Sequence, residues 1–144
     1  MWFMMIVKAG KDCEAGKTVS EDILQAIGNF NQDLRKAGAL VELSRLHPSA
    51  KGARVTFSGG KHTVIDGPFA ETKELIGGYW IIQVNSKADA IEWAKRVPVP
   101  KGDDQEIAIE IRQFLEVEDI ALSEAAMRPA EPGKEFAKTR AHAR

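Results

Sequence analysis

The chain has little of the chemistry that marks disulfide-bonded or metal-dependent proteins. It holds one cysteine, Cys13, and three histidines among 144 residues. A single cysteine excludes an internal disulfide framework and a cysteine-rich zinc site, and we therefore expect a cytoplasmic protein. The histidines show no His-x-x-x-His spacing, and the paired glycines lack the flanking pattern of a phosphate-binding loop. The sequence thus predicts no metal site and no cofactor.

An excess of charge of one sign is also missing. The 20 basic and 21 acidic residues nearly cancel, whereas a protein that binds the phosphate backbone of a nucleic acid shows a basic excess. The apolar run Trp2–Val7 is only six residues long and has no basic flank. It is too short for a membrane span or a signal-peptide core. We expect neither nucleic acid nor a membrane as a partner, and we interpret the run as a strand.

What is present is enough hydrophobic content, 44% of the residues, for one domain with a real core. Runs of apolar residues at strand and helix periodicity predict the elements. After a loop over 8–16, Thr18 and Glu21 have capping-box spacing at the start of a helix, and Gly59-Gly60 predicts a hairpin turn. Strands are predicted over Trp2–Val7, Leu40–Leu46, Ala53–Phe57, His62–Ile65, Tyr79–Val84 and Ile107–Arg112, and helices over Val19–Ala37 and from the Ser86 cap to Val97.

This order predicts an α+β fold, a ferredoxin-like sandwich with an inserted β-hairpin and both helices on one face of an antiparallel sheet. Alternation along the strands directs Trp80 and Ile82 toward the helices. It leaves Tyr79, Ile81 and Phe114 on the open face. A second copy packed sheet to sheet would cover this apolar area, which predicts a homodimer built as an α+β barrel. The alternative is a semi-polar face left in contact with water.

The segment Asp66–Glu74, which reads Asp-Gly-Pro-Phe-Ala-Glu-Thr-Lys-Glu, is the most informative stretch of the chain. Pro68 lacks a backbone N–H and restricts the preceding Gly67, so no central strand or helix continues there. The Asp66 carboxylate has no N–H two residues on to accept from. Its nearest donor is the N–H of Phe69, in an Asx-type turn.

This segment, together with Leu46–Ser49, Lys51–Val55 and Gly77–Trp80, resembles the DGPF subgroup of YCII-related proteins. The resemblance covers a domain over residues 1–116, and we expect residues 117–144 to form a partly mobile extension. It implies a dimeric α+β barrel and a cleft between sheet and loop for a small molecule. It brings no established reaction. Some relatives resemble domains fused to sigma-factor-like proteins, which suggests a regulatory setting.

The resemblance also implies an acid–base pair, in which a histidine from the first helix lies near the motif aspartate. Asp66 matches that aspartate, but the predicted first helix contains no histidine. His47 is a candidate replacement, because it ends a strand and a histidine–carboxylate contact permits general acid–base chemistry near neutral pH. His62 lies four residues before Asp66 on one strand, roughly 13 Å away, so the two side chains cannot meet directly.

Each candidate has a structural alternative. Asp66 is either a turn former or a ligand contact, and His47 is either a catalytic partner or bonded to a backbone carbonyl. Charged groups near the motif either clamp a polar ligand or form solvated ion pairs. For Arg112 and Glu110 the alternative is an ion pair between copies across a dimer. The candidate catalytic residues are Asp66 and His47, and the candidate ligand-binding residues are Phe69, Glu71, Lys73, Tyr79 and Arg112.

Three functions stay open at this point. The first is a dimer that binds a small molecule or acts on it weakly, with the motif loop as the site. The second is a non-enzymatic regulatory or interaction module that uses the dimer and the C-terminal tail, where five Lys or Arg residues outnumber two Glu from Met127 to Arg144. The third is single-stranded RNA binding on the open sheet, which requires a stacking motif that neither inner strand has.

Overall fold

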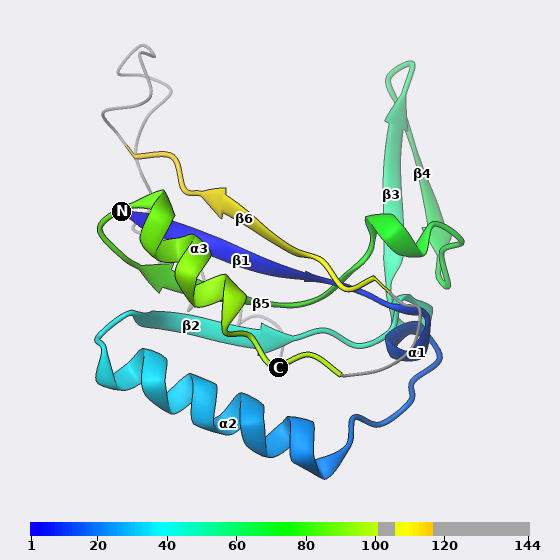
Figure 1. Cartoon of the computed structure of the whole chain (residues 1–144). Coiled ribbons are helices and arrows are strands. Elements are labelled where there is room, and N and C mark those ends of the chain that lie inside the picture. The colour runs from blue at the N-terminus through cyan, green and yellow to red at the C-terminus, as the bar shows by residue number, and fades with distance from the viewer. Residues whose placement is uncertain (101–105, 117–144) are drawn as a thin grey trace, which may run out of the picture. The chain divides into compact units, whose positions relative to one another are not determined.

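The computed structural model describes residues 1–100 and 106–116. Residues Met1–Phe114 form one compact unit, which contains every helix and strand given below (Figure 1). The predicted mobility of the C-terminal tail concerns residues outside the described part.

Four antiparallel strands form the main sheet. They are β1 (Trp2–Lys8), β2 (Leu40–Arg45), β5 (Ile76–Gln83) and β6 (Ile109–Gln113), and they lie in the order β2-β5-β1-β6. The long central pair places Met5 opposite Trp80 and Phe3 opposite Ile82. The fold is therefore α+β with an antiparallel sheet, as predicted, and the strand order is compatible with a ferredoxin-like sandwich.

Two helices pack on one face of this sheet. The helix α2 (Glu21–Lys36) follows β1, and α3 (Lys87–Lys95) follows β5. The predicted start of the first helix was wrong: the N-cap is Ser20, whose hydroxyl accepts from the N–H of Ile23 at 3.4 Å, and not Thr18. The segment expected to be a loop contains a further short helix, α1 (Lys11–Glu14).

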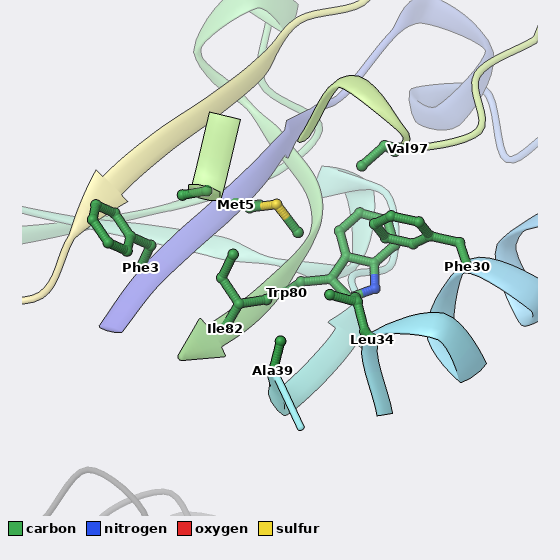
Figure 2. Packing of buried hydrophobic residues seen from close by; sticks show 9 residues of the cluster. Phe3, Met5, Phe30, Leu34, Ala39, Trp80, Ile82 and Val97 are labelled. Atoms are coloured by element: carbon green, nitrogen blue, oxygen red, sulfur yellow. The ribbon is translucent and has the colours of Figure 1, made fainter. Parts of the chain in front are cut away.

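Aromatic rings fill the space between sheet and helices (Figure 2). Phe30 of α2 meets Trp80 of β5 edge to face, with 5.4 Å between the ring centroids, and Trp93 of α3 at 6.1 Å. The indole N–H of Trp80 donates to Asn31 Oδ1 at 2.7 Å, so the buried ring keeps its hydrogen bond. The predicted orientation of Trp80 and Ile82 toward the helices is confirmed, because both belong to this core.

The opposite face of the sheet differs from the prediction. Ile81 is fully buried within the single chain, although it points away from the helices. Tyr79 and Phe114 are only half-buried, and Phe114 meets the ring of Trp2 edge to face. The expectation that Ile81 leaves apolar area in water was therefore wrong, and this face exposes less apolar surface than the strand pattern suggested.

Between β2 and β5 the chain forms a separate two-stranded sheet. Its strands are β3 (Ala53–Ser58) and β4 (Lys61–Asp66). Gly59 and Gly60 form the turn with φ of +58° and +77°, a region that side chains disfavour. Figure 1 shows the hairpin as an arm beside the main sheet, and every residue of both strands is exposed.

Two leucines on α2 provide a matched test of the core. Leu34 is 0% exposed and Leu24 is 45% exposed. We expect Leu34→Ala to lower the free energy of unfolding by about 2–5 kcal/mol, because it removes buried methyl groups and leaves a cavity. Leu24→Ala should cost well under half of that in urea unfolding monitored by tryptophan fluorescence. Equal losses for the two variants would contradict this packing of α2.

Candidate functional site

The motif loop, residues 67–75 between β4 and β5, is held by hydrogen bonds to distant parts of the chain. The N–H of Gly67 donates to Gly52 O at 3.0 Å, and the N–H of Phe69 donates to Ser49 Oγ at 3.0 Å. At the far end, Leu75 O accepts from the N–H of Ala9 at 2.9 Å. The loop includes a cis peptide bond between Gly67 and Pro68 and a 3-10 turn, η2 (Thr72–Glu74).

The predicted Asx turn is therefore wrong. The N–H of Phe69 has Ser49 Oγ as its acceptor, and not the Asp66 carboxylate. Ser49 opens a 3-10 turn, η1 (Ser49–Lys51), directly after Pro48. This turn brings the hydroxyl into the position that the sequence assigned to Asp66.

Ser49 also connects the loop to the short helix α1. The Glu14 carboxylate accepts from Ser49 N at 3.0 Å with Oε1 and from Ser49 Oγ at 2.5 Å with Oε2. One hydroxyl thus donates to Glu14 and accepts from Phe69. Hydrogen bonds to a charged group are stronger than neutral ones. No local pattern pointed to Glu14, because it lies 35 positions from Ser49, in a segment expected to be a loop.

Gly67 allows the backbone of the motif loop to pass close to the backbone of Ser49. A Cβ added at Gly67 would lie 1.7 Å from the carbonyl oxygen of Ser49. Any side chain would therefore force the two backbone segments apart.

The side chain of Arg54 packs over the ring of Phe69, the aromatic residue of the motif. Its guanidinium carbon lies 4.0 Å from the centroid of the Phe69 ring, a cation–π arrangement. No pattern in the sequence predicts this role for Arg54, because Phe69 lies 15 positions further along the chain, beyond the reach of any periodic pattern.

None of these contacts uses the carboxylate of Asp66. The residue is exposed and lies opposite Ala53 at the base of the hairpin. Within residues 1–100 and 106–116, no hydrogen bond or ion pair involves its side chain. The conformation of the loop does not depend on this carboxylate, which stays available for another partner.

The candidate histidines do not meet Asp66 within the chain. His47 is exposed after the end of β2, and no contact in the described part joins it to Asp66. His62 stands near the hairpin turn, with 6.3 Å between its ring centroid and that of Phe57. His47 as an acid–base partner stays a prediction.

The other candidates are spread over two places. Glu71 and Lys73 are exposed on the motif loop, whereas Tyr79 and Arg112 lie on the open face of the sheet. The Arg112 guanidinium lies 3.8 Å from Glu110 of the same strand, so this pair forms within one chain. In the described part of the protein, no hydrogen bond, ion pair or ring contact joins Tyr79 or Arg112 to the motif loop.

A cavity of about 680 Å³ lies at the other end of the main sheet. Met1, Gln83, Trp93 and Arg96 are among its lining residues. They belong to the end where β1 begins and β5 finishes, whereas the motif loop precedes β5. Across the described residues, no three His, Cys, Asp or Glu side chains gather as a metal site would require. No helix described for this chain is long and apolar enough to span a membrane.

Gly67 and Gly28 give a matched pair of glycine substitutions. We expect Gly67→Ala to lower the melting temperature by several degrees, because the added carbon collides with Ser49 O. Gly28→Ala, in the middle of α2 with open space around the new carbon, should stabilise the protein by about 0.5–1 kcal/mol. Thermal unfolding compares the two variants. A neutral Gly67→Ala would contradict the close approach.

Removing the Ser49 hydroxyl tests the anchor directly. Ser49→Ala leaves the N–H of Phe69 without its acceptor and removes one of the two hydrogen bonds between Ser49 and the Glu14 carboxylate. We expect it to cost about 1–3 kcal/mol of unfolding free energy. Ser58→Ala at the exposed end of β3 serves as the control and should be near neutral. Amide hydrogen exchange at Phe69 should accelerate in Ser49→Ala alone. Unchanged exchange there would show that this hydroxyl does not hold the loop.

Comparison with known proteins places the chain in a family. The family model "YCII-related domain" matches residues 1–114. The sequence is 33% identical over 79 residues to an uncharacterised protein of Rhizobium meliloti (strain 1021), R00369. That alignment covers 55% of this chain and 64% of the relative. The chain therefore spans less than two thirds of the length of this relative. With most of its residues matched, this chain belongs to the YCII-related domain family.

Proposed function

We propose that this protein binds a small polar molecule at the motif loop, with the Asp66 carboxylate as its main polar contact. The observation that supports the proposal is that different residues hold the motif loop in place and remain available to a ligand. Ser49, Gly52 and Arg54 maintain the loop, while the carboxylate of the motif aspartate has no hydrogen bond or ion pair in the described part. A turn-forming role would require that carboxylate to accept a backbone hydrogen bond, and the nearest donor in sequence, the N–H of Phe69, donates to Ser49 instead.

A fixed loop with an available carboxylate favours binding, because little ordering is needed when a ligand arrives. The chemistry of a carboxylate selects a ligand with an amine, a guanidine or several hydroxyl groups. Glu71 and Lys73 are exposed on the same loop and supply further charged contacts. Phe69, already stacked under Arg54, offers the edge of its ring.

Binding is better supported than catalysis. A general base must lie within hydrogen-bonding reach of its partner or of the substrate. His47 and Asp66 are both exposed and make no contact with each other in the described residues. The proposal therefore assigns Asp66 to binding and leaves His47 as a predicted second group.

A homodimer belongs to the same proposal. In the dimeric barrel, with the hairpin inserted into a ferredoxin-like sandwich, a second copy covers the open face around Tyr79 and Arg112. Support for this sheet-to-sheet contact is reduced by the burial of Ile81, whereas the half-buried Tyr79 and Phe114 still favour it. Membership of the DGPF subgroup rests on the Asp66–Phe69 run, and a cytoplasmic location rests on the single cysteine.

The binding proposal is tested with Asp66→Asn and a matched control, Asp22→Asn, which changes an exposed aspartate in the first turn of α2. Both variants should melt within a few degrees of the wild type. In a thermal-shift screen of amines, guanidines and polyols, ligands that stabilise the wild type and Asp22→Asn should bind Asp66→Asn about 10- to 100-fold more weakly by calorimetry. Equal affinity for all three proteins would contradict the role of Asp66.

A further inference from the structure

The hairpin of β3 and β4 has one apolar face that nothing in the described chain covers. In the observed register Val55 lies opposite Val64, and Phe57 lies opposite His62. Because side chains alternate across a strand, these residues share one face. We call it the hairpin face, and it consists of Ala53, Val55, Phe57, His62, Val64 and Asp66.

This face is unusually open to water. Phe57 is 79% exposed and Val64 is 60% exposed. An isolated two-stranded hairpin is at best marginally stable in water, and it normally packs against another element. On the opposite face, the contact of Arg54 with Phe69 gives some cover at the base. The hairpin face therefore has both an exposed apolar centre and a reason to be covered.

The residues along this face are arranged symmetrically about its centre. His62 and Asp66 each lie two positions from Val64 on β4, about 7 Å in opposite directions. On β3, the large Phe57 and the small Ala53 each lie two positions from Val55 in the same way. Near the turn the face thus carries His62 and the large Phe57. At the base, equally far from the centre, it carries Asp66 and the small Ala53.

We propose that two copies of this chain pair through their hairpin faces, about a two-fold axis that crosses the strands at Val55 and Val64. Such an axis runs the two hairpins in opposite directions and places β4 over β4 and β3 over β3. His62 then faces Asp66 of the partner subunit, and Phe57 faces Ala53 of the partner subunit. An imidazole, which can donate a hydrogen bond, meets a carboxylate, and large side chains meet small ones, as a closely packed interface requires.

The other two-fold arrangement fits less well. An axis parallel to the strands would place β4 over β3 and bring Phe57 against His62 at the tips. At the base it would bring Asp66 against Ala53. Large groups would meet large ones, small would meet small, and the carboxylate would be covered without a partner, which costs free energy.

The pairing deepens the proposed function, on whose Asp66 site it rests, and it forms an interface separate from the proposed sheet-to-sheet contact. Within one chain no histidine contacts the motif aspartate in the described residues. In the paired hairpins, the partner subunit's His62 lies beside Asp66 and completes a histidine–carboxylate pair at the edge of the ligand site. Such a pair both orients a ligand and is suited to proton transfer near neutral pH.

Neighbouring residues of β4 provide the matched test, because Val64 lies on the hairpin face and Ile65, 51% exposed, points to the other side. Sedimentation of the full chain without ligand, over a micromolar concentration series, gives the mass of wild type, Val64→Glu and Ile65→Glu. We expect Val64→Glu to weaken self-association at least tenfold, because the interface would bury unpaired charge. Ile65→Glu should associate as the wild type does.

Each pattern of masses decides the question. A wild type that halves its mass in Val64→Glu alone supports the pairing, including a tetramer that falls to a dimer held by its sheet faces. A monomeric wild type overturns the proposal, as does a dimer that Val64→Glu leaves intact or one that Ile65→Glu disrupts. The result does not depend on any ligand, so failure of the ligand screen and failure of the pairing are separate outcomes.

A charge exchange tests the partner contact itself. His62→Asp places two carboxylates opposite each other and should weaken the dimer about tenfold. The double variant His62→Asp with Asp66→His restores a histidine opposite an aspartate and should recover wild-type association within about threefold. Circular dichroism confirms that each variant is folded. A double variant as weak as His62→Asp would show that these two residues do not face each other.

Discussion

The position of the motif loop depends on the hydroxyl of Ser49. It accepts from the N–H of Phe69 and donates to the carboxylate of Glu14, so it joins three segments that are far apart in the sequence. The contact is possible because Gly67 has no side chain where it passes the carbonyl oxygen of Ser49. Removing one partner of a half-buried hydrogen bond costs more free energy than the bond contributes net, because the other partner is left unsatisfied. The loss of this one hydroxyl would therefore affect the whole motif loop.

This arrangement separates the residues that maintain the loop from those available for chemistry. One end of the loop is tied to Gly52 through the N–H of Gly67, and the other end to the N–H of Ala9 through Leu75 O. Its centre is held by Ser49 and Arg54. Asp66 stands at the junction of loop and hairpin without a structural task in the described residues. Functional groups supported by such a frame lose little freedom on binding.

The hairpin adds an exposed apolar surface beside Asp66. Its two faces differ: Arg54 turns toward Phe69 and the loop, whereas Val55, Val64 and Phe57 face water beside Asp66. The proposed ligand site and the exposed apolar surface therefore meet at Asp66. Covering the hairpin face would also remove water from around the Asp66 carboxylate, and charges interact more strongly in such surroundings. The proposed self-association and the proposed ligand binding would be linked in this way.

The sequence by itself determined the elements and the class of fold. Periodicity identified the strands and both long helices, and it directed Trp80 and Ile82 into the core, because these signals come from neighbouring residues. It also singled out Asp66 and Phe69 through the proline-containing turn. It did not determine the acceptor for Phe69, the cap at Ser20, the short helix α1 or the burial of Ile81. The tertiary structure decided these, because a hydrogen bond between Ser49 and Glu14 joins residues 35 positions apart, and no local pattern records such a contact.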